Sequence, residues 1–406
     1  MSFGPPWRRN FYLYQSANFI SLLGDFVGSM ALHWWILSKS SGISELSSIF
    51  VVGNIVRLVS LPLLGPIGDR YCRRNLLNLA DLLSCISCVA FALIVYLDHT
   101  DLFIISIFNG ILSLANSIFR AGSMGMVAEL VPNQWLSRAI SHQQIAMTMA
   151  TILGSAISSL LISAVGIALA IILDACAIAV AIILIRNIKL NAPEGKRFAT
   201  IGEWGLDFLQ GLQFIIKRRP LVMALFIVVM INSLLVPFDL ILPFYMQKVR
   251  AATVWQLGMI ESSLALGSVL ASLAFMLGPL RRRPLSIIFI ALFLMAIALY
   301  LFSLSHSIAS LVFFAGLFGA SQVLFFIPVR SRIMLFLPQE FRSRVGVIFS
   351  FAQQLGSPVS IMMTSYLLRS FTVPMVLTSL ASLILLLVPA IFFLPGFTKL
   401  LASDNT

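Results

Sequence analysis

Charged residues are scarce in this chain. Lysine, arginine, aspartate and glutamate together make up 10% of its 406 residues, whereas hydrophobic residues make up 59%. A soluble domain carries about 25% charged residues, because its surface faces water. This chain has too few polar side chains to cover such a surface. The composition excludes a water-soluble protein and predicts an all-α polytopic membrane protein.

Histidine and cysteine are also scarce, with four of each. Cys85 and Cys88 are three residues apart, a spacing found in metal and redox pairs, but no second pair of ligands accompanies them. We therefore interpret the cysteines as small apolar residues. The histidines form no metal-binding motif, and the chain has no nucleotide-binding loop. The sequence predicts no catalytic residue, no metal and no cofactor, so we expect no enzyme.

Long polar stretches are almost absent as well. Only residues 187–218 form a sizeable polar segment, and we expect its part from residue 201 to 215 to be an amphipathic helix on the membrane surface. The rest consists of apolar runs that each approach or exceed the roughly 20 residues that span a bilayer. The twelve predicted spans are residues 11–37, 48–66, 75–97, 102–127, 136–164, 166–186, 219–246, 254–277, 284–304, 307–335, 343–369 and 373–396. The predicted domains are therefore a six-helix bundle (1–186), a cytoplasmic linker (187–218) and a second six-helix bundle (219–406).

The net charge of +12 is distributed unevenly between the two sides of the predicted bundle. If both termini are cytoplasmic, the outer loops receive only Lys39, Lys248, Arg250 and Arg369, and the other loop bases lie inside. This asymmetry satisfies the positive-inside rule. Bases scattered over short loops make no nucleic-acid site. We expect a multi-pass protein of the bacterial cytoplasmic (inner) membrane, with both termini cytoplasmic and no cleavable signal peptide.

A charged stretch follows the second predicted span. An apolar run ends in Gly65-Pro66, four charges fall between Asp69 and Arg74, and the next apolar run begins at Leu76. One aspartate and three arginines do not belong in hydrocarbon, so we expect a tight loop at the membrane surface, on the cytoplasmic side.

The pattern Gly-x-x-x-Asp-Arg-x-x-Arg-Arg between the second and third spans resembles the signature loop of the major facilitator superfamily, with Cys72 in place of the usual glycine. The resemblance covers the whole chain, and the macrolide- and drug-efflux-like branch of bacterial exporters is the most similar. It implies that this loop is a gate, formed by contacts between the two halves that hold the outward-facing state. The alternative is a loop that only sets topology. The gate residues would be Gly65, Asp69, Arg70, Arg73 and Arg74.

The two sets of six spans are weakly alike. Leu64-Gly65-Pro66 is repeated as Leu277-Gly278-Pro279, and both precede arginine clusters. Asn18 and Asp25 are repeated, at the same spacing, as Asn232 and Asp239. Such parallel repeats are typical of twelve-helix transporters of this kind.

Ionisable groups inside spans are costly and are therefore candidates for function. Asp25 lies in the middle of the first span, and Arg57 of the second is a plausible partner whose pairing a proton would break. Asp239 and Glu261 are candidates for a second titrating site, or side chains that reach the outer interface. For Asp81 we expect a structural ion pair with Arg74, and we place Asp174 in a peripheral helix.

The resemblance implies a substrate cavity lined by spans 1, 4, 7 and 10. Aromatic residues with a few amides favour a bulky amphipathic solute over an ion or a sugar. The alternative for many of these aromatic residues is helix packing or contact with lipid. The cavity candidates are Trp34, Trp35, Asn109, Asn116, Asn232, Phe238, Phe314, Phe318 and Gln322.

The prediction from the sequence is a monomeric secondary transporter in the bilayer, driven by protons and exporting an amphipathic small molecule that resembles a drug or a siderophore. The fifth span lacks the proline and later glycine that superfamily antiporters usually carry around Gly154. Two alternatives stay open: an uptake permease for a metabolite, and a membrane sensor or assembly partner that transports nothing.

Overall fold

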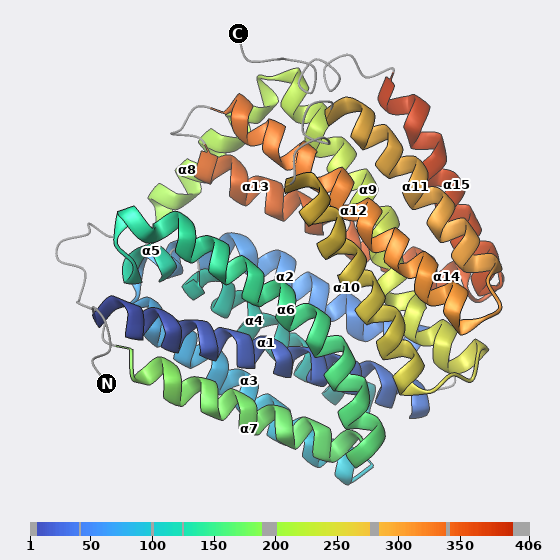
Figure 1. The fold of residues 1–406 in the computed structure, drawn as a ribbon, viewed down its shortest axis with the longest axis horizontal. Helices are drawn as coiled ribbons and strands as arrows, with labels where there is room; N and C mark the ends of the chain where they lie inside the picture. The colour runs from blue at the N-terminus through green and yellow to red at the C-terminus, as the bar shows by residue number, and fades with distance from the viewer. Residues whose placement is uncertain are drawn as a thin grey trace. The chain divides into compact units, whose positions relative to one another are not determined.

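The computed structural model describes residues 6–39, 42–98, 101–123, 126–188, 201–276, 284–337 and 342–392. The chain divides into two compact units (Figure 1). The first unit comprises Met1–Trp204 and Thr253–Gly258, and the second Gly205–Ala252 and Met259–Thr406.

Helices make up nearly all of the described chain (Figure 1). In the first part of the chain they are α1 (Pro6–Lys39), α2 (Ile43–Arg70), α3 (Arg73–Tyr96), α4 (Leu102–Ser123), α5 (Met126–Leu130), α6 (Asn133–Val165) and α7 (Ile167–Arg186). The remaining helices are α8 (Ile201–Ile216), α9 (Arg219–Phe244), the π-helix η1 (Tyr245–Val249), α10 (Val254–Met276), α11 (Pro284–Leu304), α12 (Ile308–Phe336), α13 (Arg342–Leu355), α14 (Ser357–Leu367) and α15 (Val373–Phe392).

Within the described residues, helix occupies most of each of the twelve predicted spans. Within the described residues, ten helices are long and apolar enough to cross a membrane: α1 to α4, α6, α7 and α9 to α12. The eleventh span is divided into α13 and α14 at Gly356, where a Cβ atom would overlap the hydroxyl of Ser233 on α9. The twelfth, α15, has a shorter apolar core, Val373–Pro389. The prediction of an all-α polytopic membrane fold is confirmed.

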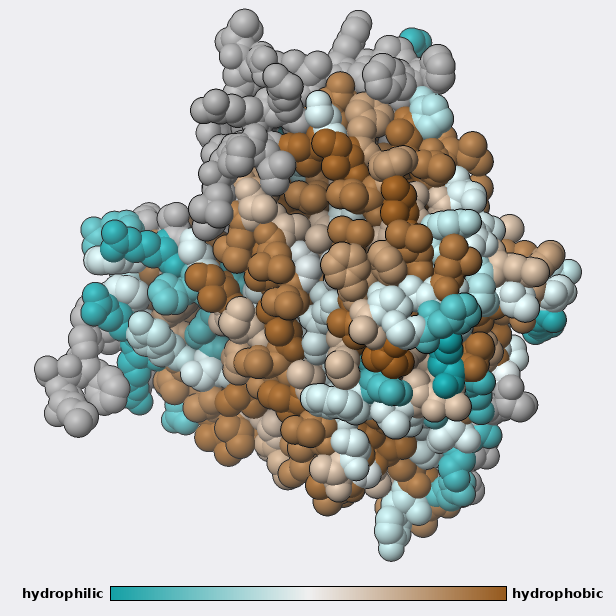
Figure 2. All heavy atoms as spheres, turned by 45° about the vertical axis from the view of Figure 1, so that its right-hand side comes forward, coloured by the Kyte–Doolittle hydropathy of each residue, from teal (hydrophilic) through white to brown (hydrophobic). Residues whose placement is uncertain are grey.

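α3 shows how the sequence is arranged for a membrane. Between residues 77 and 95 its exposed residues are apolar and recur every three or four positions, at Leu79, Leu82, Ile86, Val89 and Leu93. This spacing places them on one face of the helix. Asp81, Ser84 and Ser87 of this stretch are buried on other faces. The apolar face therefore meets lipid, and the hydrophobic side chains over much of the visible surface fit the same solvent (Figure 2).

The two units repeat the same helix pairs. In the first unit α3 packs against α4 and α7, and α1 against α6 and α7. In the second, α11 packs against α12 and α15, and α9 against α13, α14 and α15. These pairs correspond in order along the two halves of the chain. The predicted pseudo-repeat is therefore present in the packing.

Two polar segments differ from the prediction or match it only in part. The charged stretch is mostly helix, because α2 continues to Arg70 and α3 begins at Arg73, so the connection is only Tyr71 and Cys72. Gly-Pro pairs are tolerated within membrane helices, where neighbouring groups satisfy the freed backbone atoms. Residues 189–200 of the predicted linker lie outside the described residues, and α8 forms where the short helix is predicted.

Candidate functional site

Asp25 occupies the middle of α1, and its side chain is half-buried. Its backbone carbonyl accepts a hydrogen bond from Ser29 Oγ at 2.6 Å, a bond within the helix. The charged groups that act electrostatically on Asp25 are Asp174, Asp81, Arg120 and Arg57. Its charged neighbours therefore include two carboxyl groups, from α3 and α7, as well as Arg57, the partner considered from the sequence. A role of Asp25 in proton coupling remains a prediction.

The second unit places Asp239 and Glu261 within reach of each other's charge. Asp239 lies on α9 with an exposed side chain, and Glu261 on α10 is half-buried. Asp239 is the charged group that acts on Glu261. The repeat counterpart of Asp25 thus also interacts with a second carboxyl group. Whether either acid titrates during a transport cycle remains a prediction.

The cavity candidates of the first unit make different contacts. Asn109 Nδ2 donates to the Ile49 carbonyl at 2.7 Å, and a Cβ atom at Gly53 would lie 2.5 Å from this nitrogen. Asn109 therefore holds α4 against α2. Asn116, seven residues later on α4, is half-buried. Trp35 is buried and packs edge-on against Phe91, with 5.7 Å between ring centroids.

The cavity candidates of the second unit also differ in burial: two are buried in aromatic packing, and the others are half-buried. Phe238 and Phe318 are buried, and their ring centroids lie 4.8 Å apart. Phe238 also packs edge-on against Phe302, at 5.3 Å. The structure thus gives Phe238 and Phe318 a packing role, the alternative already considered for such residues. Asn232 donates to its own helix, to the Val228 carbonyl at 2.9 Å. Two further candidates, Phe314 and Gln322, are half-buried.

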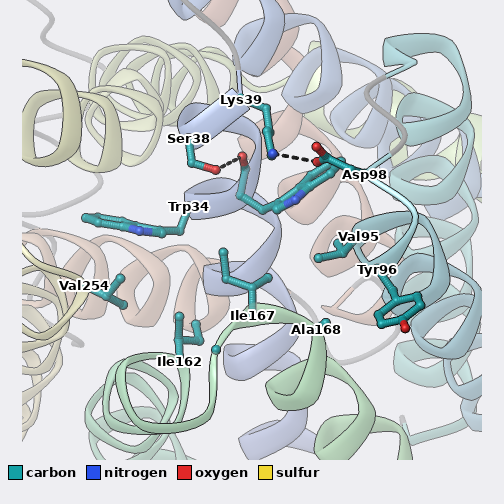
Figure 3. A pocket seen from close by; sticks show the side chains of 12 residues that line it. Trp34, Ser38, Lys39, Val95, Tyr96, Asp98, Ile162, Ile167, Ala168 and Val254 are labelled. Carbon is teal, nitrogen blue, oxygen red and sulfur yellow. Dashed lines mark hydrogen bonds and ion pairs between the residues drawn. The ribbon is translucent and has the colours of Figure 1, made fainter.

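A pocket of about 620 Å³ lies at one end of the first unit (Figure 3). Trp34 and Trp35 contribute to its wall, together with Tyr96 at the end of α3 and Gly166 between α6 and α7. An ion pair joins Lys39 Nζ to Asp98 Oδ1 at 2.6 Å beside it. Two predicted cavity residues therefore meet here. The pocket combines aromatic surface with one partly exposed ion pair, which suits an amphipathic organic molecule.

The described gate residues make contacts inside the first unit. Arg73 Nε lies 3.3 Å from Glu129 Oε2, so this pair joins the start of α3 to α5. Arg74 Nη1 donates to the Ile188 carbonyl, after α7, at 3.1 Å. The side chains of Gly65, Asp69 and Arg70 lie outside the described ones. A lone glutamate after the fourth apolar run was the available signal for the Arg73 partner, and the sequence reasoning missed it.

The predicted pair between Arg74 and Asp81 is wrong. Asp81 Oδ1 instead accepts a hydrogen bond from Ser21 Oγ of α1 at 3.3 Å. Asp174 lies on α7, whose exposed residues Ile172, Val180 and Ile183 fit the predicted peripheral helix, whereas its own carboxyl group is buried. Its helix packs against α1, and its carboxyl group lies against Gly24 and Gly28. The two glycines, four residues apart, were the sequence signal for this close approach.

The sequence profile of the Major Facilitator Superfamily matches residues 16–361. The chain belongs to the Major Facilitator Superfamily. This result confirms the family predicted from the signature pattern, and it makes the protein a multi-pass membrane transporter by family and fold.

Two curated superfamily relatives illustrate the sequence similarity. Macrolide efflux protein A of Streptococcus pyogenes is 18% identical over 293 residues, which cover 72% of each chain. The uncharacterized MFS-type transporter YkuC of Bacillus subtilis is 22% identical over 226 residues, 54% of this chain and 52% of that one.

Solved structures of superfamily transporters share the fold. The nucleoside transporter NupG aligns with a TM-score of 0.75 at 12% identity, over 97% of this chain and 100% of that one. A bacterial homologue of the human lysosomal transporter Spinster, in an inward-facing and unoccupied conformation, aligns with a TM-score of 0.76 at 10% identity, over the full length of both chains. At such identities the likeness concerns the fold alone.

Proposed function

We propose that this superfamily member exports an amphipathic small organic molecule from the cytoplasm by alternating access, driven by protons that enter the cell. The observation that carries the proposal is Asp25, a half-buried carboxyl group in the middle of a spanning helix. An ionisable group at that depth is costly and needs a reason to be there. A carboxyl group that gains and loses one proton during the cycle supplies such a reason.

The nature of the solute rests on two independent features. Macrolide efflux protein A, whose name states that it exports macrolides, aligns with most of this chain. Trp34 and Trp35 line a pocket that also contains the Lys39–Asp98 ion pair. Macrolides are bulky and amphipathic, and aromatic walls with few polar groups favour such compounds. Drugs and siderophore-like molecules are the classes to test first.

Uptake is the second candidate direction, and the nucleoside transporter NupG shows that the fold is also found in carriers of small polar solutes. A sensor that transports nothing is disfavoured, because the charged stretch and the intramembrane acids are both present. Export is the better proposal because the curated relative with the broad alignment is an efflux protein.

The signature stretch is the proposed gate of this cycle, on the cytoplasmic side. Asp69→Asn removes the one negative charge among its arginines, so we expect normal expression but transport slowed by about tenfold or more. Transport would be measured in vesicles beside Arg70→Ala and Arg73→Ala, of which the second should be milder. Wild-type transport by Asp69→Asn would leave this stretch only a determinant of topology.

Transport in inside-out vesicles tests the function directly. An outward-directed exporter loads such vesicles, so an imposed pH gradient that is acid inside should drive accumulation of its substrate. The gradient would be applied to vesicles with the protein and to matched vesicles without it, against a panel of macrolides, other drugs and siderophores. Dissipation of the gradient by a protonophore should abolish accumulation.

Two results would contradict the proposal. Accumulation that persists after the gradient has been dissipated would remove proton coupling. Loading of right-side-out vesicles, which runs opposite to export, would establish uptake instead. Asp101→Asn, at an exposed position before α4, is the matched carboxylate control and should transport as the wild type does.

A further inference from the structure

Three carboxyl groups gather in the first unit where α1 meets α3 and α7. Asp25 is on α1, Asp81 on α3 and Asp174 on α7. Asp81 and Asp174 are nearly inaccessible, with 2% and 3% of their surfaces exposed. Both act on the charge of Asp25. This group is called the α1–α3–α7 acid site below.

Asp81 is held by a single hydroxyl group. Ser21 Oγ, one turn before Asp25 on α1, donates to Asp81 Oδ1 at 3.3 Å. The other oxygen, Oδ2, is buried and has no hydrogen-bond partner. Asn78 Oδ1, three residues earlier on α3, is a second buried oxygen without a donor. Residues three apart share a helix face, so both oxygens belong to the same side of α3.

Asp174 lies in a notch on α1. A Cβ atom at Gly24 would overlap Asp174 Oδ1, and one at Gly28 would lie 2.8 Å from Oδ2. The two glycines therefore leave space that the carboxyl group fills. Cys88 Sγ, a weak donor, contacts Oδ2 at 3.4 Å. Oδ1 is buried and has no hydrogen-bond partner. It lies against Gly24, the residue that precedes Asp25 on α1.

These contacts do not suit two ionised carboxylates. An ionised carboxylate in an apolar interior needs a cation or several strong donors. Asp81 has one neutral hydroxyl donor and Asp174 one thiol. The positive groups that act on this region through Asp25 are Arg120 of α4 and Arg57 of α2. The remaining titratable neighbours, Cys85 and Cys88 of α3 and Cys176 of α7, are neutral when they carry their own protons.

The ligand chemistry that fits is a proton. A proton that binds the oxygen without a hydrogen-bond partner removes the negative charge of the carboxylate. The same oxygen then carries an O–H group, which donates a hydrogen bond and no longer needs a donor. A metal ion would need three or more suitable ligands around one point, and no group of three His, Cys, Asp or Glu side chains in the described residues could hold one. The unpartnered oxygens and the notch thus point to the same ligand.

We propose that the α1–α3–α7 acid site holds at least one exchangeable proton between Asp81, Asp174 and Asp25, and is the coupling site of the transporter. The proposal rests on the proton-coupled function above and adds the residues that carry the proton. The sequence suggested that proton coupling involves an ion pair between Asp25 and Arg57. The proposal here places it instead in the carboxyl groups where α1 packs against α3 and α7.

The step is one of proton transfer alone. A hydronium O–H bond breaks as an O–H bond forms on a carboxyl oxygen, which leaves water. On the other side the carboxyl O–H bond breaks and the proton forms a new O–H bond with water, which restores hydronium. No electron changes hands. Because α1, α3 and α7 meet here, the protonation state sets the charge that these helices pack around.

Infrared difference spectroscopy of the purified, reconstituted full-length transporter tests this site without any substrate. A protonated carboxyl group has a carbonyl stretch that is separate from ionised carboxylates and shifts in D₂O. We expect the wild type to show such a band at neutral pH and to lose it on alkaline titration. Asp81→Asn and Asp174→Asn should each diminish the band or shift its midpoint, whereas Asp101→Asn, an exposed acid, should leave it unchanged.

Two milder variants keep the test valid if the asparagine variants do not fold. Ser21→Ala removes the donor to Asp81 and keeps all three acids, so the band should persist with a shifted frequency. Gly24→Ala pushes a methyl group against Asp174 and should shift the titration midpoint. Size-exclusion profiles establish that each variant is folded before its spectrum is compared.

Three outcomes overturn the proposal. A band that is identical in all variants places the proton elsewhere, and its absence from the wild type removes the proton. Loss of the wild-type band on addition of Na⁺ at constant pH makes the site a cation site. These readings are independent of transport. If the wild type shows no gradient-driven export but the spectra behave as expected, the proposed function fails while the proton-holding site stands.

Discussion

The seam between α3 and α7 and the seam between α11 and α15 occupy equivalent places in the two halves, yet their chemistry differs. The first contains Asp81 and Asp174, both buried. The sequences of α11 and α15 contain no charged residue at all, and the two helices still pack closely. Packing of this helix pair therefore does not require carboxyl groups. Because buried acids without a cation partner cost stability, their presence in only one of these two seams indicates a task that the equivalent seam does not share.

Glycine is used differently in the two units as well. On α1, Gly24 and Gly28 make space for the side chain of Asp174. Between α10 and α12, a Cβ atom at Gly267 would overlap the backbone carbonyl of Gly316, and one at Gly319 would overlap that of Leu264. Ser263 Oγ donates to the Val312 carbonyl at 2.6 Å across the same contact. The second unit thus brings backbones together, as small residues commonly do in membranes.

The largest expected effect is at Asp25. Asp25→Asn permanently mimics the protonated form, so we expect uphill export to fall to background while downhill exchange or substrate binding survives. Its repeat counterpart supplies the matched variant, because Asp239→Asn should be milder if the coupling chemistry belongs to the first unit. The measurement is substrate accumulation in inside-out vesicles with and without a pH gradient. Gradient-driven export at the wild-type rate by Asp25→Asn would shift attention to Asp239 and Glu261.

The next effect concerns an acid placed in the second seam. Met295 of α11 is buried, near the position that corresponds to Asp81. Met295→Asp should destabilise the protein by about 3 kcal/mol, the usual cost of a carboxylate at the centre of a membrane helix. Thermal unfolding in detergent would be compared with Met295→Leu, a swap of similar volume that should cost under about 1.5 kcal/mol. Equal unfolding temperatures for the two variants would mean that both seams accept an acid.

A smaller effect separates the two uses of glycine. Gly267→Ala should lose about 1–3 kcal/mol, because its methyl group meets a backbone carbonyl that shifts only with its helix. Gly24→Ala meets the end of a side chain, so its loss of stability should be smaller, with a larger loss of uphill transport. Thermal unfolding and vesicle transport of both variants would be compared. A larger destabilisation by Gly24→Ala would reverse this interpretation of the two contacts.

The smallest effect is at the charged end of the first unit. The first arginine cluster has an acid nearby in the chain, whereas Arg281-Arg282-Arg283 of the second has none. The pair Arg73–Glu129, with side chains 16% and 29% exposed, should show a coupling energy of about 0.5–1 kcal/mol in a double-mutant cycle of unfolding. Lys39–Asp98, at 40% and 62% exposed, should show less. The reverse order would mean that exposure does not determine the strength of these pairs.

Much of the fold could be predicted because every segment that crosses hydrocarbon must be an apolar helix of about 20 residues. The family could be predicted from the apolar runs of helical length and the signature pattern. The pseudo-repeat could be predicted from the recurrence of Asn18 and Asp25 as Asn232 and Asp239. The candidate site could be predicted only in part. Asp25 stood out as a charge in an apolar run, but its neighbours did not. Arg57 was chosen because it lies in the next helix, whereas Asp174 comes from the sixth span.

The sequence by itself determined that this is a helical membrane protein, since scarcity of charge and the length of the apolar runs depend on composition and local order alone. The signature pattern added the resemblance to a superfamily of transporters. Only the tertiary structure decided which polar groups meet. Asp81 reaches Ser21 rather than Arg74, Arg73 reaches Glu129, and Asp174 fills the notch at Gly24. These partners lie far apart in the chain, and their choice depends on the rotation of each helix about its axis. Helix packing sets that rotation, and an apolar run does not record it.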